Sequence, residues 1–279
     1  MSYPNLGDAD YGDFWRDGYV LKAGYFDAEE IALLDQAIGL DEGIRRNIIQ
    51  LDDGDGASIE QALWNHPGDD LFGAFARGER VVGGMEKLLG GEVYHYHSKL
   101  TMKRPRVGGA WNWHQDYGYW YHNGCLFPDM ATVAIAVDRA TRENGCLQVL
   151  RGSHKLGRID HGAVGGQTGA DRDRFAEVEK CLDHVYVEMA PGDALFFHCN
   201  TLHCSAQNKS DKSRNLLVCC YNKASNNPVK EHHHPCYTPL VKMPDSAIKK
   251  LGLTLDADNR KFFNPDEDRT ISDPKRVGR

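Results

Sequence analysis

The chain has 279 residues, a formal net charge of −7, a hydrophobic fraction of 41% and a charged fraction of 26%, as expected of a globular enzyme with a sizeable core. The acidic balance argues against a nucleic-acid binder, whose footprint would be a basic stripe. No apolar run reaches the roughly 18 residues of a membrane span, and the first residues lack the pattern of a secretory signal. The eight scattered cysteines, without a C-x-x-C pair, predict reduced thiols in a cytoplasmic protein.

The first third of the chain is expected to be helical. Asp27 and Glu30 form a capping box ahead of apolar residues at helical spacing, and Gly39 offers a stop. A second helical stretch opens near Asp69 and ends at Gly90. We therefore expect a helical front over about residues 1–92.

From Val93 the pattern changes to a period of two, which predicts a long strand. Alternating polar residues suit a barrel with a wet, functional interior. The expected inward face carries His95, His97, Lys99, Thr101 and Lys103, and the opposite face carries Tyr94, Tyr96, Leu100 and Met102.

Further strands separated by turn residues, with no alternation of strands and helices, predict a mainly β fold. We expect a double-stranded β-helix, that is, a cupin-like jelly roll, with flanking N-terminal helices. A single domain would span residues 1–279, with its body over about 93–225 and an irregular C-terminal cover over about 226–279. The expected later strands cover residues 132–137, 146–150, 184–189, 194–198 and 215–222.

The sequence His114-Gln115-Asp116, together with the later His203, is the most informative chemical pattern. Two imidazoles and one carboxylate form the facial triad of non-haem Fe(II) oxygenases, which leaves coordination positions open. On a strand, His114 and Asp116 would project to the same side. His203 is expected at the far end of a later strand, so that the three predicted metal ligands would converge.

Arg214 is expected to open the last strand, beside His203. A guanidinium can hold a dicarboxylate through two parallel charge-assisted hydrogen bonds, which a lysine cannot reproduce. The alternative is a surface ion pair with the nearby Asp211.

Taken together, these motifs resemble the phytanoyl-CoA dioxygenase family of Fe(II)/2-oxoglutarate-dependent oxygenases. The resemblance runs over about residues 10–225, and one stretch, residues 199–203, is also similar to ectoine hydroxylase. The matching motifs are Asp17-Gly18-Tyr19, His114-Gln115-Asp116, Glu143-Asn144-Gly145, Gly152-Ser153-His154, Pro191-Gly192-Asp193 and His203 with Arg214.

The resemblance implies that His114, Asp116 and His203 bind iron, that Arg214 holds the far carboxylate of 2-oxoglutarate, and that Ser205 assists it. Some relatives carry a tryptophan in the strand after the H-x-D motif, where this chain has residues 133–136. Lys99 and Thr101 are candidates to contact 2-oxoglutarate instead, and Gln115 is a further candidate for cofactor binding.

The implied activity is hydroxylation of a small molecule, with succinate and CO2 as co-products. The cofactors would be Fe(II), 2-oxoglutarate and O2, and ascorbate is expected to stimulate turnover. Two alternatives remain open at this point: a cupin-like metalloenzyme that does not use 2-oxoglutarate, and a metal-binding protein without turnover. The identity of the substrate is not encoded in any motif.

Two further features have competing interpretations. Aromatic residues follow the H-x-D motif, and Tyr117 and Trp120 could either pack the barrel rim or form a wall against an apolar or cationic substrate group.

The run of residues 232–234 consists of three histidines beside Pro235. Because adjacent side chains on an extended segment point to opposite sides, we expect a solvent loop rather than a metal site.

Overall fold

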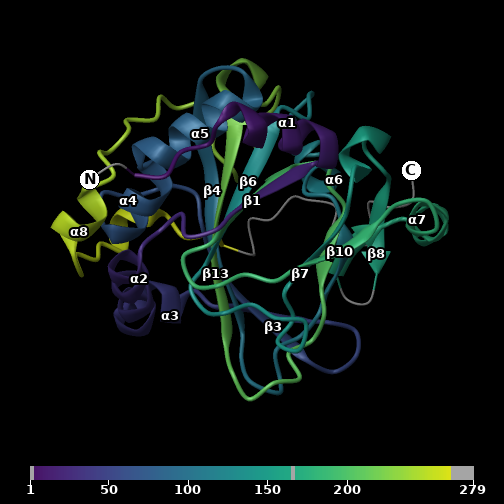
Figure 1. Ribbon diagram of the computed structural model, residues 1–279, viewed down its shortest axis with the longest axis horizontal. Coiled ribbons are helices and arrows are strands. Elements are labelled where there is room, and N and C mark those ends of the chain that lie inside the picture. Colours follow the sequence, from purple (N-terminus) through teal and green to yellow (C-terminus); the bar gives the residue numbers. More distant parts are fainter. Residues whose placement is uncertain (1–2, 165–166, 265–279) are drawn as a thin grey trace.

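In the computed structural model, residues 3–164 and 167–264 are described. Two antiparallel sheets face each other, and helices cover the outer face of the larger one (Figure 1). The predicted jelly roll is therefore confirmed. None of the helices in these two ranges combines the length and apolar character needed to cross a bilayer. The part of the predicted cover beyond residue 264 lies outside the described residues.

The larger sheet has seven strands, in the order β1-β11-β6-β13-β4-β3-β2. Three of them come from the segment that was expected to be a helical front, so that expectation is corrected. Hydrogen bonding to the neighbouring strands decides this, since β1 pairs with β11 and β3 pairs with β4. The strands are β1 (Tyr19–Lys22), β2 (Ile49–Asp52), β3 (Ser58–Trp64), β4 (Val93–Lys103), β6 (Met130–Ala136), β11 (Ala194–His198) and β13 (Arg214–Lys223).

The smaller sheet has four strands, in the order β10-β7-β12-β5, and a separate hairpin lies beside it. The expected strands of the jelly-roll body are all present, with ends displaced by no more than a few residues. The smaller sheet contains β5 (Trp111–His114), β7 (Leu147–Leu150), β10 (His184–Val187) and β12 (His203–Ser205), and the hairpin contains β8 (His161–Val164) and β9 (Gln167–Ala170).

Most of the helices pack on the outer face of the larger sheet, opposite the smaller sheet, whereas α7 lies beside β8 and β10 (Figure 1). The predicted capping box is confirmed, because Asp27 accepts hydrogen bonds from the amides of residues 29 and 30 while Glu30 accepts one from the Asp27 amide. The second helical stretch is broken at Gly78, whose backbone is extended. The α-helices are α1 (Asp8–Asp17), α2 (Ala28–Leu40), α3 (Glu42–Arg46), α4 (Leu71–Arg77), α5 (Glu79–Leu89), α6 (Tyr117–Trp120), α7 (Arg172–Glu179) and α8 (Ala247–Leu251).

A β-bulge in β4 changes which side chains face the smaller sheet. The pairing with β13 passes from His97 opposite Cys220 to His95 opposite Tyr221, so Tyr96 is an extra residue. The bulge reverses the alternation before this point. Tyr94 and Tyr96 therefore pack on the inner face with Val218, whereas His95 lies beside Tyr221 on the helical side. The predicted faces are correct for residues 97–103 and wrong for residues 94–96.

Candidate active site

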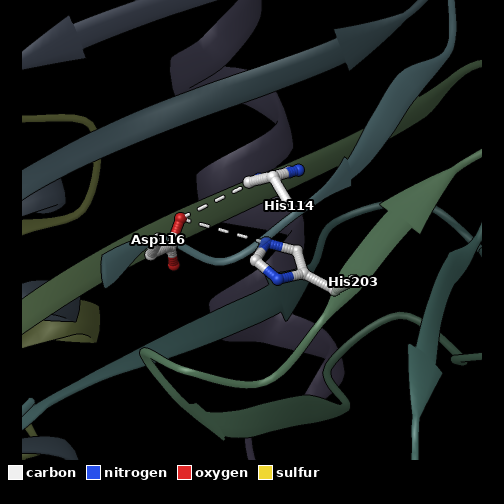
Figure 2. A group of neighbouring side chains, drawn as sticks. All are labelled: His114, Asp116 and His203. Atoms are coloured by element: carbon white, nitrogen blue, oxygen red, sulfur yellow. Dashed lines mark ion pairs between the residues drawn. The ribbon is translucent and has the colours of Figure 1, made fainter. Parts of the chain in front are cut away.

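The three predicted metal ligands meet between the two sheets. His114 ends β5, and His203 begins the neighbouring β12 directly opposite it. The candidate ligand atoms of these two residues and Asp116 all lie within 4.8 Å of one another, and all three residues are buried. Figure 2 shows both imidazoles beside the same carboxylate.

The backbone placement of Asp116 differs from the expectation. Asp116 does not continue the strand of His114, because the chain turns there and its φ and ψ of −57° and −37° are helical. The carboxylate therefore approaches from the start of α6. Convergence with His114 results from this turn rather than from the two-residue period of a strand.

Each histidine is held in one orientation by a backbone carbonyl two residues earlier. His114 Nδ1 lies 2.6 Å from the oxygen of Asn112, and His203 Nδ1 lies 2.9 Å from the oxygen of Thr201. Because a carbonyl only accepts, each Nδ1 must carry the proton, and each Nε2 keeps its lone pair. The Nε2 atoms face Asp116 Oδ1 at 4.0 and 3.9 Å, too far for a hydrogen bond.

The protonation states suit a divalent cation. Burial lowers the pKa of His114 and of His203, so both rings are neutral at physiological pH. Burial alone would raise the pKa of Asp116, but the nearby His203 and Lys99 lower it overall, so the carboxylate is ionised. Two neutral imidazoles and one carboxylate are the donor set typical of a non-haem Fe(II) site.

Thr132 fixes the second oxygen of the same carboxylate and was not predicted as a site residue. Its hydroxyl donates to Asp116 Oδ2 at 3.2 Å, and the side chain is fully buried on β6. No sequence motif marks it, because the contact depends on α6 and β6 lying together. Oδ1 is consequently left to face the two imidazoles.

Replacing Thr132 with valine is expected to weaken divalent-metal binding by about tenfold or more, because loss of such an outer contact typically costs about 10–100-fold in affinity. Thr132→Ser keeps the hydroxyl and should bind metal nearly as the unmodified protein does. Anaerobic calorimetric titration with Fe(II) measures both. Equal affinities in the valine and serine variants would remove Thr132 from the site.

A cavity lies beside the predicted ligands, between the two sheets. His114 and His203 line it near the candidate metal position, and Arg214 lines it where β13 begins. Lys99 and Thr101 line it from β4, as predicted for the polar face, and Ser205, Trp111, Ala134, Leu147, Phe197, Cys204, Leu216 and Val218 complete it.

Arg214 is a buried cation that has no anionic partner among the described residues. Only 1% of its surface is exposed, and no carboxylate of the described residues lies within ion-pair distance, so the surface pair with Asp211 is excluded. Its Nη1 donates to Thr101 Oγ1 at 3.2 Å, while its Nε has no partner among the described residues. Burial lowers the pKa of Arg214 to about 10, so it stays charged at neutral pH. The neighbouring Ser205 hydroxyl is also buried, and it has no hydrogen-bond partner within residues 3–164 and 167–264.

These observations fit the far carboxylate of 2-oxoglutarate, because a buried charge requires a compensating partner. Thr101 holds the guanidinium in place. Lys103, on the same face, is already engaged by the carbonyl oxygens of Gly109 and Ala206. Lys99 remains the second cation of the cavity.

The side chain of Gln115 bonds to the backbone of three neighbouring residues, and its predicted contact with the cofactor remains a prediction. Its amide nitrogen donates to the carbonyl oxygens of Gly157 and Asn200, each at 2.8 Å, and its amide oxygen accepts from the Ile159 amide at 2.7 Å. The side chain thus ties together two loops and is absent from the cavity lining. Its position between two predicted ligands gave no indication of this orientation.

The aromatic segment after Asp116 forms the short helix α6, whose Tyr117 and Trp120 are both 3% exposed. The Tyr117 hydroxyl donates to the Cys125 carbonyl oxygen at 3.1 Å, and the ring packs against Tyr121. Neither Tyr117 nor Trp120 lines the cavity described above. For Tyr117 these contacts favour the packing interpretation, and its predicted contact with substrate remains a prediction.

Truncation of Tyr117 to alanine is expected to destabilise the fold by about 3–5 kcal/mol, as for other large buried aromatic residues. The ratio of hydroxylated product to succinate should stay unchanged if packing is its only role. Thermal unfolding and product stoichiometry measured on the same preparation separate the two roles. A lower ratio with normal stability would instead support the substrate wall.

His234 is buried, which corrects the expectation of a solvent loop at residues 232–234. Its ring stacks on His97, with centroids 4.7 Å apart and an interplanar angle of 24°. Asn65, directly after β3, bonds to His234 and to the backbone of His233. The segment therefore folds over the inner face near the predicted iron ligands.

Comparisons with known proteins agree with the geometry of the site. Residues 14–216 match the family model "Phytanoyl-CoA dioxygenase (PhyH)". The chain is 32% identical to an L-proline trans-4-hydroxylase of Streptomyces griseoviridis over 253 residues, which cover 84% of this chain and 91% of that protein. It is 27% identical to an ectoine dioxygenase of Stutzerimonas stutzeri, over 76% of each chain.

Solved structures with the same fold include EctD from S. alaskensis. Its structure with 2-oxoglutarate and 5-hydroxyectoine has a TM-score of 0.71 and 23% identity, covering 86% of this chain and 89% of that one. The same enzyme with bound Fe gives a TM-score of 0.70 and 24% identity. At this level of identity the likeness establishes the shared jelly-roll architecture.

Proposed function

Because the chain belongs to the phytanoyl-CoA dioxygenase family and is an Fe(II)/2-oxoglutarate-dependent dioxygenase, we propose that it hydroxylates a free amino acid of the L-proline type at an unactivated carbon. Membership of this enzyme class excludes the two alternatives, which were a metalloenzyme that does not use 2-oxoglutarate and a metal-binding protein without turnover. Support for the substrate class comes from the similarity to the L-proline hydroxylase, which extends over nearly the whole of that protein.

The observation that carries the enzymatic role is a His-Asp-His cluster whose two histidines line the same cavity as a buried arginine, which has no carboxylate partner among the described residues. In the proposal, His114, Asp116 and His203 hold Fe(II) on one face. Arg214 binds the far carboxylate of 2-oxoglutarate, and Ser205 donates to it. Thr101 orients Arg214.

The bound iron and 2-oxoglutarate, with O2, supply the oxidising chemistry: a C–H bond of the substrate becomes C–OH while 2-oxoglutarate becomes succinate and CO2. The protein groups bind and orient these partners and exclude water. Retention of the carboxylate at Asp116 favours hydroxylation, because it occupies the position that oxygenase-like halogenases vacate for a halide. Ascorbate is expected to stimulate turnover.

The test is incubation of the protein with Fe(II), 2-oxoglutarate and ascorbate, with and without L-proline. We expect L-proline to stimulate succinate release, with one hydroxylated product per succinate by mass spectrometry. Ring-size relatives, azetidine-2-carboxylate and pipecolate, probe the width of the substrate class. If none of the three stimulates turnover above the background without substrate, the proposed substrate class is wrong, although the enzyme class stands.

A further inference from the structure

Along β4, His97 lies far from Arg214, the proposed 2-oxoglutarate anchor, and close to the predicted iron ligand Asp116. On the inner face of the larger sheet, Arg214 of β13 is opposite Lys103 of β4. The pair formed by Cys220 and His97 is the third inner-face pair after it along the two strands. At about 3.3 Å per residue this is a span of roughly 20 Å. Cys220 also pairs with Thr132, which holds Asp116. His97 is therefore at the level of Asp116, where a substrate rather than 2-oxoglutarate would lie.

Aromatic rings enclose this position. The His97 ring stacks on His234, and Trp120 meets His97 edge-on at 5.7 Å between centroids. Tyr96, which the bulge brings to the inner face, lies 5.4 Å from His97 and 4.7 Å from His234. His97 and His234 are only 3% and 8% exposed. Two imidazoles thus share a buried, aromatic-walled position beside a predicted iron ligand.

The hydrogen bonds of His234 determine which of its nitrogens is free to accept. The amide nitrogen of Asn65 donates to the His233 carbonyl oxygen at 2.7 Å, so the amide oxygen must face His234 Nδ1, 3.0 Å away. Because that oxygen only accepts, Nδ1 carries the proton, and Nε2 of the neutral ring has a lone pair. His97 Nδ1 is buried and has no hydrogen-bond partner among the described residues. Burial lowers the pKa of both rings well below the ordinary value, so both are neutral.

We infer that His97 and His234, walled by Tyr96 and Trp120, bind the positively charged nitrogen of the substrate. This inference rests on the proposed function. It adds that the amino group of the substrate, rather than its carboxylate, faces His97 and His234. The N–H groups of an ammonium are donors that match the imidazole lone pairs, and aromatic faces attract a cation. A carboxylate at the same place would face the lone pair of His234 Nε2, which repels it unless that buried ring is protonated. Lys99, one pair nearer to Arg214, is the cation that suits the substrate's carboxylate.

The test compares two ligands that differ only at this nitrogen: L-proline and (S)-tetrahydrofuran-2-carboxylate, which has an ether oxygen in place of the ring ammonium. Each is titrated by calorimetry, without oxygen, into the protein loaded with Fe(II) and 2-oxoglutarate. We expect L-proline to bind at least about tenfold more tightly. His97→Phe and His234→Phe keep the rings but remove the acceptors, and they should reduce the preference toward unity by weakening L-proline binding alone.

His97→Gln retains an acceptor and should keep most of the preference, which distinguishes recognition from a structural role. His184→Phe, an exposed histidine on β10, is the matched control and should behave as the unmodified protein. The affinities for Fe(II) and 2-oxoglutarate should be unaltered in every variant. Provided that L-proline binds, the inference is overturned if the unmodified protein binds the ether analogue equally well, or if both phenylalanine variants keep the preference for L-proline.

If the proposed substrate class is wrong, the experiment gives a different result from the one expected if only the cation site is wrong. If L-proline neither binds nor stimulates turnover, the proposed function falls, and small ammonium compounds and their uncharged isosteres are then screened for stimulated 2-oxoglutarate turnover. Stimulation by uncharged or anionic compounds alone would overturn the cation site as well. Stimulation by an ammonium compound that is lost in His97→Phe and kept in His97→Gln would support it.

Discussion

Asp116→Ala is expected to abolish Fe(II)-dependent turnover and to remove high-affinity Fe(II) binding. The carboxylate is the only anionic member of the donor set, and Thr132 and both imidazoles are arranged around it. His114→Ala and His203→Ala should have the same effect, because each removes a nitrogen whose orientation is fixed by the backbone. Anaerobic titration with Fe(II) and succinate release measure the two losses.

These three variants should remain folded, because none of the residues belongs to the hydrophobic clusters that hold the sheets together. Circular dichroism and thermal unfolding check this. Asp211→Ala removes an exposed carboxylate paired with Arg106 and serves as the control with normal metal binding. Normal Fe(II) affinity in any of the three site variants would show that the residue concerned is not a ligand.

Arg214→Lys is expected to raise the apparent KM for 2-oxoglutarate by at least about tenfold, on the order of 1.4 kcal/mol. Lysine keeps the charge but loses the planar fork, so it cannot grip a carboxylate through two bonds while another nitrogen contacts Thr101. The dependence of the reaction rate on Fe(II) concentration should change little. Initial rates over a range of 2-oxoglutarate concentrations give the result.

Arg106→Lys is the matched control, since Arg106 is exposed and its pair with Asp211 lies at the surface. Its KM for 2-oxoglutarate should equal that of the unmodified protein. An unchanged KM in Arg214→Lys would place the far carboxylate elsewhere. Lys99, the other cation that lines the cavity, would then be the next candidate.

The sequence by itself determined the chemistry and six of the thirteen strands in the described residues. Period-two alternation and turn residues are local signals, and they located β4, β6, β7, β10, β11 and β13 to within a few residues. The residue types of His114, Asp116, His203 and Arg214 are sufficient to indicate a donor set for iron and a site for a dicarboxylate. These predictions required no knowledge of which segments lie side by side.

Only the tertiary structure decided which way several of these side chains point. Hydrogen bonding to β13 introduces the bulge at Tyr96 and so moves His95 away from the inner face, and no residue pattern within β4 reveals it. The turn at Asp116, the hydroxyl of Thr132 and the burial of His234 likewise depend on contacts between segments remote in sequence. Residue type is read from the chain alone, but a side chain's orientation and partners depend on the register and packing of other strands.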